Sequence, residues 1–176
     1  GVGQRVRDED VQLDLAAGEF RFRFDLPGEP IEIAYSYPYP PSMASELLYE
    51  LAQYPGVEVS YPGNSAGGRS LPYLVMRCTN PHKQPEIVWL LSREHAGEVS
   101  GAYTLDGFLR AAVTSSLREH VEIHAIPMVD LDAVTEGRYG KVAPPVDHHV
   151  AWCADTPRPE IRLAMELMED SVSGGK

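Results

Sequence analysis

Residues 87–98 have the sequence Ile-Val-Trp-Leu-Leu-Ser-Arg-Glu-His-Ala-Gly-Glu, and the chain can be interpreted outward from them. The first five residues are apolar without alternation, which indicates a strand covered on both faces. A helix is predicted to begin close to Glu98, with one side formed by Gly101, Leu105, Phe108, Leu109 and Ala112. His95 and Glu98 are therefore expected between the end of a buried strand and the start of a helix.

Helix and strand signals alternate on both sides of this segment. A first helix is predicted behind Ser42, its expected cap, with Met43, Leu47, Leu51 and Tyr54 at helical spacing. Strands are predicted at 57–61, 71–78, 86–91 and 121–129, with a Gly- and Ser-rich loop at 62–70 and a last helix from Pro159. This order predicts an α/β fold with a mixed β-sheet between helix layers.

The first forty residues have a different character. Residues 20–24 and 31–35 alternate between apolar and polar side chains, with the turn signal Pro27-Gly28 between them, and predict a β-hairpin. The Tyr- and Pro-rich run at 37–41 predicts a stiff linker. We expect two parts: a β-strand segment at 1–38 and an α/β domain at 42–176.

Composition and charge exclude several classes of function. The 26 acidic and 15 basic residues give a formal net charge of -11, so we expect no nucleic-acid partner. No apolar run approaches the roughly 20 residues that span a bilayer, so we expect no membrane span. The chain begins with Gly1 rather than Met. We expect a cytoplasmic protein, or an organellar one after removal of a targeting segment.

His95 and Glu98 are residue types that hold zinc. Zinc binds imidazole nitrogen and carboxylate oxygen, and catalytic sites use three protein ligands with one position left for water. In α/β folds, ligands bind beyond the carboxyl ends of the strands, which is where this pair is predicted. The spacing alone has little force, because a surface pair that caps the helix would look the same.

The segment from Leu90 to Leu109 resembles the zinc metallocarboxypeptidase family: a buried strand, Arg-Glu-His-Ala-Gly-Glu, then a Gly-containing amphipathic helix. Residues 20–39 look like the last strands of the small β-domain of its cytosolic carboxypeptidases. Residues 126–134 are similar to a strand and turn of the family, and residues 159–162 to a helix start of its bacterial members. The resemblance implies part of a carboxypeptidase-type α/β/α fold, with zinc as cofactor and His95 and Glu98 as two of its three ligands.

The same resemblance shows departures from the family. Gly140 stands where the family has an arginine that stabilises the oxyanion. His149 and Val150 stand where Asn and Arg hold the substrate's terminal carboxylate. Arg138 or Lys141 could supply a nearby positive charge.

The family's third ligand, a His, and its general base, a Glu, are expected beyond Lys176. His148 and His149 are adjacent, so on a strand at most one could face a metal, and His149 is the candidate for a replacement ligand. His124, in the predicted strand 121–129, is expected to be structural. The chain is thus interpreted as an incomplete or degenerate family member.

Two functional hypotheses follow. One is a carboxypeptidase-like domain that is catalytically impaired, a pseudoenzyme, and serves as a binding or structural subunit with protein partners in a larger assembly. The alternative is a portion of an active zinc metallocarboxypeptidase, completed by a missing segment, that hydrolyses C-terminal residues of peptides or protein tails. A metal at His95 and Glu98 is common to both.

Overall fold

The computed structural model describes residues 6–25, 28, 33–34 and 36–173. The chain divides into two compact units, residues 1–38 and residues 39–176. No helix in the described part of the chain is both long and apolar enough to cross a membrane.

The first unit contains a small antiparallel hairpin. A 3-10 turn, Asp8–Asp10, leads into β1 (Val11–Asp14), which pairs with β2 (Glu19–Phe22). Asp14 stabilises the turn between them, because its Oδ1 accepts hydrogen bonds from the backbone N–H groups of Ala16 and Ala17. The hairpin was predicted between 20–24 and 31–35. The described partner of β2 is β1, and most of the predicted second strand lies outside the described residues.

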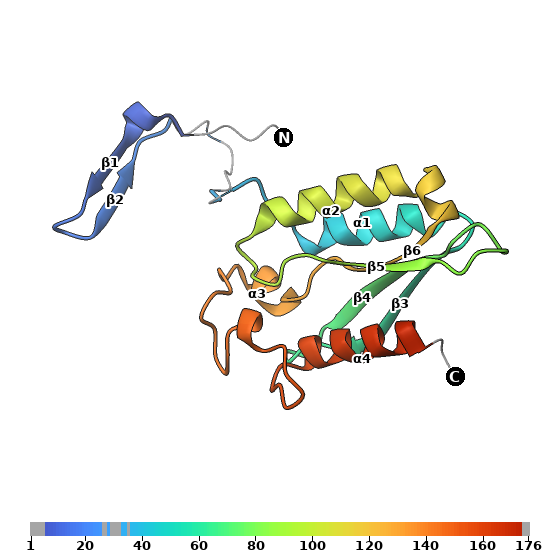
Figure 1. Ribbon diagram of the computed structural model, residues 1–176. Helices are drawn as coiled ribbons and strands as arrows, with labels where there is room; N and C mark the ends of the chain where they lie inside the picture. Colours follow the sequence, from blue (N-terminus) through green and yellow to red (C-terminus); the bar gives the residue numbers. More distant parts are fainter. Residues whose placement is uncertain (1–5, 26–27, 29–32, 35, 174–176) are drawn as a thin grey trace. The chain divides into compact units, whose positions relative to one another are not determined.

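The second unit is built on a four-stranded mixed sheet (Figure 1). Its strands are β3 (Val57–Asn64), β4 (Ser70–Met76), β5 (Glu86–Leu91) and β6 (Val121–Ile126), in the order β3-β4-β6-β5. β4 is antiparallel to both of its neighbours, whereas β5 runs parallel to β6. The carboxyl ends of β5 and β6 therefore meet at the same edge of the sheet.

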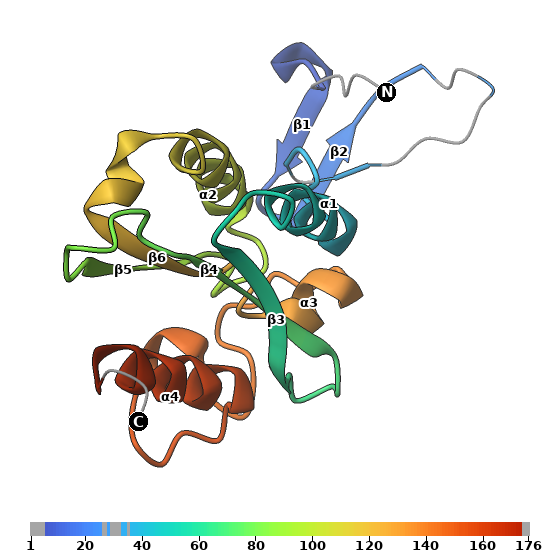
Figure 2. The same ribbon diagram turned by 90° about the vertical axis from the view of Figure 1, so that its right-hand side faces the viewer.

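Helices cover both faces of this sheet. α1 (Pro41–Leu51) and α2 (Val99–Ala112) lie on one face and α4 (Pro159–Ser173) on the other, as Figures 1 and 2 show from two sides. The core on the first side is formed by Leu47, Leu51, Leu74, Leu105, Leu109 and Ile123, among others, and the core under α4 by Ile126, Val129, Ala151, Ile161 and Ala164. The predicted α/β fold with a mixed sheet between helix layers is confirmed.

Short helices lie in the connections. α3 (Leu131–Glu136), which the sequence analysis did not predict, follows β6, and 3-10 turns occur at Ser116–Glu119 and His148–Val150. Asp130 caps α3 because its side chain accepts a hydrogen bond from the N–H of Ala133, and Gly137 ends it with a positive φ of 68°. α3 thus begins close to the carboxyl end of β6, whereas the turn Ser116–Glu119 leads into the start of β6.

Several predicted element boundaries were wrong. The strand predicted at 71–78 ends at Met76, and the strand predicted at 121–129 ends at Ile126. Ser42 is not the cap of α1: the cap residue is Pro40, and Pro41 starts the helix with the φ angle that its ring fixes. The predicted loop 62–70 is shorter, because β3 continues to Asn64. The remaining turn is tied to Asp132, which accepts hydrogen bonds from Ser65 Oγ (2.7 Å), Gly67 N (2.6 Å) and Arg69 (2.6 Å).

β5 is less covered than its sequence suggested. Residues 87–91 are half-buried, although they were predicted to be covered on both faces. The reason is position: β5 is the last strand in the sheet, and among the described residues no strand pairs with its outer edge. Its sequence is that of an interior strand, because apolar side chains point to both faces.

We expect the Leu74→Ala variant to lose about 2–5 kcal/mol of the free energy of unfolding, because Leu74 in β4 is completely buried and its truncation leaves a cavity. Urea unfolding followed by circular dichroism measures this loss. Leu117→Ala is the matched control, since Leu117 is 37% exposed, and it should change the free energy by well under half as much. Equal losses in both variants would contradict this description of the core.

Candidate metal site

His95 and Glu98 lie just beyond the carboxyl end of β5, as predicted, in the connection to α2. Two backbone hydrogen bonds tie this connection to the end of β6: Val129 N donates to Ser92 O (3.0 Å) and Asp130 N to Arg93 O (2.9 Å). Arg93 has a φ of 54°, which is unusual for a residue other than glycine. Such strain persists only where the surroundings hold it, and it gathers at functional sites.

The imidazole of His95 lies between two carboxylates. Its Nδ1 is 3.2 Å from Glu98 Oε1, and its Nε2 is 2.8 Å from Asp147 Oδ1. The side chain of His95 is about 10% exposed, whereas that of Glu98 is 46% exposed. One nitrogen thus faces an inner carboxylate and the other faces Glu98 at the surface of the site.

Asp147 binds three groups at once. Besides His95, its Oδ1 accepts a hydrogen bond from His149 N (2.9 Å) and its Oδ2 accepts one from Val142 N. These bonds, with that to His95 first, hold the pKa of Asp147 well below its usual range. Because an ionised carboxylate only accepts hydrogen bonds, the Nε2 of His95 must carry the proton that it donates to Asp147.

When His95 is neutral, its proton stays on Nε2 and the lone pair of Nδ1 is available to a metal; when His95 is protonated, Nδ1 donates to Glu98 instead. Ligating histidines usually donate their other ring N–H to a carboxylate, which fixes the tautomer and the ring orientation. Two ligands about 2.1 Å from a tetrahedral zinc ion lie about 3.4 Å apart. The 3.2 Å between His95 Nδ1 and Glu98 Oε1 is close to that spacing. The two residues therefore fit zinc as two of its ligands.

A third ligand is missing from the described part of the chain. No group of three or more His, Cys, Asp or Glu side chains there is arranged to hold a metal ion. His149, the candidate for a replacement ligand, is exposed in the 3-10 turn and offers its backbone N–H rather than its ring to the site. His148, its neighbour, is completely buried and faces Glu160. The site consists of two candidate ligands and one orienting carboxylate.

The two positions where the resembled family has arginines, Gly140 and Val150, contain no positive charge. Gly140 has a φ of 94°, and a Cβ built on it would lie 2.7 Å from Ala96 N and 2.9 Å from Asp130 Oδ2. A larger residue would therefore be strained at this position in the present backbone. Val150 is 63% exposed and apolar. Neither residue can pair with a carboxylate.

Lys141 brings a positive charge into the site. Its Nζ lies 2.9 Å from Glu98 Oε1, whereas Arg138 pairs with Glu136 (2.8 Å). The Lys141 ammonium, followed by burial and the bond to His95, sets the pKa of Glu98, and the net effect lowers it. Burial opposes the charged form of His95, but its bonds to Asp147 and Glu98 outweigh this effect and raise its pKa.

Behind the site lies a buried ionisable cluster, defined by Asp130, His148, Arg158 and Glu160. The Nε2 of His148 is 2.8 Å from Glu160 Oε1, and its Nδ1 is 3.8 Å from Asp130 Oδ2. Arg158 donates hydrogen bonds to the carbonyls of Ala143, Pro144 and Val146. The cluster therefore connects the end of β6 and the start of α4 to the segment that carries Asp147.

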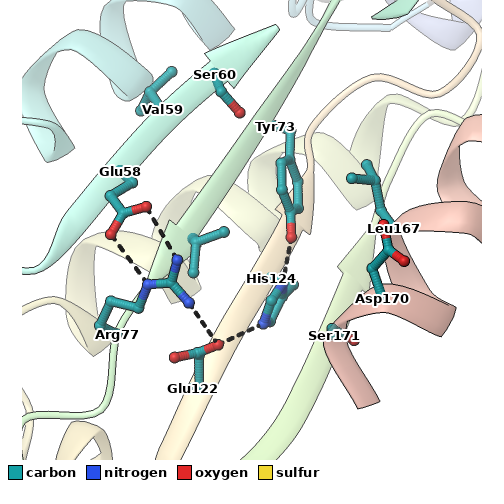
Figure 3. A pocket seen from close by; sticks show the side chains of 11 residues that line it. Glu58, Val59, Ser60, Tyr73, Arg77, Glu122, His124, Leu167, Asp170 and Ser171 are labelled. Atoms are coloured by element: carbon teal, nitrogen blue, oxygen red, sulfur yellow. Dashed lines mark hydrogen bonds and ion pairs between the residues drawn. The ribbon is translucent and has the colours of Figure 1, made fainter. Parts of the chain in front are cut away.

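A groove of about 780 Å³ lies at the opposite end of the sheet, where β6 begins (Figure 3). Its polar groups satisfy one another: Arg77 pairs with Glu58 and Glu122, and His124 bonds to Glu122 and Tyr73. Burial lowers the pKa of His124. In the neutral ring, Nε2 donates to the Glu122 carboxylate (2.9 Å), so Nδ1 accepts from the Tyr73 hydroxyl. His124 has the structural role that was expected of it.

Asp147 was missed by the sequence analysis, which considered only His148, His149 and Val150 of its segment. The sequence nevertheless contained a signal for Asp147. A metal-binding His needs an acceptor for its other nitrogen, and Asp147 is a carboxylate in the segment that the resemblance had already aligned with the family's substrate site. Lys141 was considered, and only the loop geometry shows that it reaches Glu98.

We expect Glu160→Gln to lower the free energy of unfolding by about 1–3 kcal/mol at pH 7, because it weakens a buried pair with His148. Burial raises the pKa of Glu160, but the bond from His148 and other contacts outweigh it, so the net direction is down. A lowered pKa contributes stability that is complete above the ordinary value of 4.5 and is lost as pH falls through the folded value.

Urea unfolding at a series of pH values tests this expectation. The difference between the wild type and Glu160→Gln should shrink as the pH falls below 4.5. Glu166→Gln, at an exposed position of the same helix, should stay within about 0.5 kcal/mol of the wild type at every pH. If the difference in free energy of unfolding grew as the pH fell, the pKa of Glu160 would be raised by folding rather than lowered.

Sequence comparisons place this chain in no family. No family model matches the sequence. An uncharacterized protein from Zymomonas mobilis subsp. mobilis is 24% identical over 133 residues, which are 72% of this chain and 34% of that protein. The chain thus spans about a third of the length of this curated relative.

Three solved bacterial structures are similar to this chain. A Shewanella denitrificans protein assigned as a carboxypeptidase A has a TM-score of 0.79 at 19% identity, over 91% of this chain and 44% of its own. A Pseudomonas aeruginosa metallo-carboxypeptidase in complex with (2-guanidinoethylmercapto)succinic acid has a TM-score of 0.73 at 23% identity, and the match covers 90% of this chain and 44% of that one. A Burkholderia cenocepacia metallo-carboxypeptidase has a TM-score of 0.67 at 22% identity, and the match covers 75% of this chain and 38% of that one. The chain has a carboxypeptidase-type α/β fold, over less than half the length of each structure.

Proposed function

We propose that this chain carries one half of a zinc metallocarboxypeptidase-like site, in which His95 Nδ1 and the Glu98 carboxylate hold the ion. The observation that carries the proposal is the bond between His95 Nε2 and Asp147 (2.8 Å), which leaves Nδ1 directed at Glu98 (3.2 Å). A surface pair that only capped the helix would need no such orienting carboxylate. The side chain of Glu98 also makes no capping hydrogen bond to α2.

The bound ion would supply Lewis acidity toward a peptide carbonyl and lower the pKa of a bound water. The residues of this chain would do the rest of the positioning. His95 and Glu98 would bind the ion, and Asp147 would keep the imidazole of His95 in the tautomer that leaves Nδ1 unprotonated. The ligand class that this lineage favours is the C-terminal tail of a peptide or protein.

By its own described residues the chain is better suited to binding than to hydrolysis. A missing oxyanion donor, as at Gly140, typically lowers the rate about a hundred- to thousandfold. We therefore propose a catalytically impaired domain that acts as a binding or structural subunit. The alternative is an active peptidase in which another segment supplies the third ligand and the general base.

The closer assignment to cytosolic carboxypeptidases belongs to the same proposal. It rests on residues 20–39, whose Tyr- and Pro-rich end resembles the junction after that branch's small β-domain. The hairpin of β1 and β2 in a separate compact unit supports this interpretation. A cytoplasmic location would follow from this assignment.

The edge of β5 favours a partner for this domain. Its residues 87–91 are apolar and half-buried, and no described strand pairs with the outer edge. Native proteins usually cover, charge or shorten such an edge. We propose that another strand completes the sheet there, from a longer form of the chain or from a second protein.

Zinc binding tests the first proposal. We expect the purified chain to bind about one zinc ion, with His95→Gln and Glu98→Gln each abolishing binding because they remove a ligand. Asp147→Asn should weaken binding about 10- to 100-fold by disturbing the orientation of His95. Competition with a chromophoric chelator measures the affinities.

His82→Gln is the matched control, because His82 is exposed in a turn between β4 and β5, and it should bind zinc as the wild type does. Zinc binding that survives both His95→Gln and Glu98→Gln would exclude this site. Wild-type protein without any zinc affinity would exclude the proposal altogether.

Amide hydrogen exchange tests the proposal for β5. In the chain alone we expect amides of β5 to exchange at least about tenfold faster than those of β6, which lies between two strands. Mass spectrometry of peptides from 86–91 and 121–126 provides the comparison. Equal protection of the two strands would show that the edge of β5 needs no partner.

A further inference from the structure

Lys141 occupies an unexpected place in the candidate site. Its Nζ lies 2.9 Å from Glu98 Oε1, and the same oxygen is 3.2 Å from His95 Nδ1. One carboxylate oxygen is therefore shared by the imidazole and an ammonium group. That oxygen is the one which a metal between His95 and Glu98 would need.

We propose that Lys141 is a tethered cation that competes with the metal for Glu98, so that metal binding releases the Lys141 ammonium from the site. The inference rests on the proposed zinc site, and it adds a second state of the same site. In the metal-free state the ammonium neutralises Glu98. In the metal-bound state the ion takes over that oxygen.

Charge makes the two cations exclude each other. An ammonium that stayed within hydrogen-bond distance of Oε1 would lie close to a divalent ion on the same atom, and like charges at such distances repel strongly. The ammonium is the weaker competitor, because the side chains of Lys141 and Glu98 are each nearly half exposed, and exposed ion pairs are weak in water.

The backbone around Lys141 is held in place, so that only its side chain can move away. Gly140 has no room for a Cβ, which would lie 2.7 Å from Ala96 N, and Val142 donates its N–H to Asp147. Val142 has a φ of 53°, a strained value for a β-branched residue, and the bond to Asp147 holds it there. The four-carbon stem of lysine allows the ammonium to swing outward without any change in this loop.

The released ammonium would meet an anionic ligand. Arg138 is paired with Glu136, and Arg93 donates to the carbonyl of Tyr39. Lys141 would therefore present a positive charge beside the proposed ion, suited to the carboxylate of a peptide. This gives the loop a positive charge one residue away from Gly140, where the resembled family has its arginine.

Zinc affinities of Lys141 variants test the competition. Lys141→Met keeps the stem and removes the charge, so we expect it to bind zinc about two- to fivefold more tightly than the wild type. Lys141→Arg retains a cation and should stay close to the wild type. Competition with a chromophoric chelator at fixed pH gives the three affinities, and urea unfolding confirms that the variants are folded.

The possible outcomes distinguish the competition by Lys141 from the zinc site on which it rests. Equal, measurable affinities in the wild type and Lys141→Met would overturn the competition and leave the zinc site intact. No binding in any of the three proteins would overturn the zinc site, and the inference with it. Weaker binding in Lys141→Met would show that Lys141 supports the metal rather than competing with it.

Amine labelling provides a second readout that does not depend on affinity. The chain has two other lysines, Lys83 and Lys176. Reductive methylation followed by mass spectrometry should show faster labelling of Lys141 after zinc is added, because its ammonium has left Glu98. Lys83, which contacts His120 (2.6 Å), is the internal control and should be unaffected. Unchanged labelling of Lys141 at saturating zinc would overturn the proposed release.

Discussion

The hydrogen bond between His95 Nε2 and Asp147 is the constraint on which the site depends. It determines which nitrogen of the imidazole carries a proton and which one is available to a ligand. Without it, His95 and Glu98 would be an ordinary ion pair at the start of a helix. With it, the free nitrogen faces a carboxylate at a spacing that suits a shared metal ion. Asp147 thereby turns a weak sequence pattern into a specific geometry.

The fold holds Asp147 in place at some cost in backbone strain. Val142 is held at a φ of 53° by its bond to Asp147, and Arg93, on the other side of the site, has a φ of 54°. Each such position costs on the order of 1–3 kcal/mol, which the surrounding structure must offset. The buried pair of His148 and Glu160 contributes to this, because it fixes the segment of Asp147 against α4. The strained residues and the buried pair thus lie together, beyond the carboxyl ends of β5 and β6.

Most of the α/β domain could be predicted from local sequence. The apolar run 87–91, the helical spacing behind Glu98 and Pro159 at a helix start each depend on neighbouring residues, and all three gave the right element. The errors came from interactions that are distant in sequence. Asp132, for example, shortens the predicted loop 62–70 by binding Ser65 and Arg69. The half-burial of β5 depends on its place at the edge of the sheet, which its own residues do not reveal.

The candidate site could be predicted only in part, for the same reason. His95 and Glu98 are close in sequence, so their pattern is visible. Asp147 and Lys141 reach them from a separate segment through a turn that includes Gly140. The sequence showed that this segment lacks the family's arginines. It did not show that the Asp147 carboxylate contacts His95 and that the Lys141 ammonium contacts Glu98.

Anomalous X-ray scattering from zinc-soaked crystals tests the central claim most directly. The difference map at the zinc absorption edge should show a peak between His95 Nδ1 and the Glu98 carboxylate, with the Nε2 of His95 still bonded to Asp147. A peak on the Nε2 side, with Asp147 as a ligand, would contradict the role assigned to that carboxylate. The absence of any peak near His95 at saturating zinc would contradict the metal site itself.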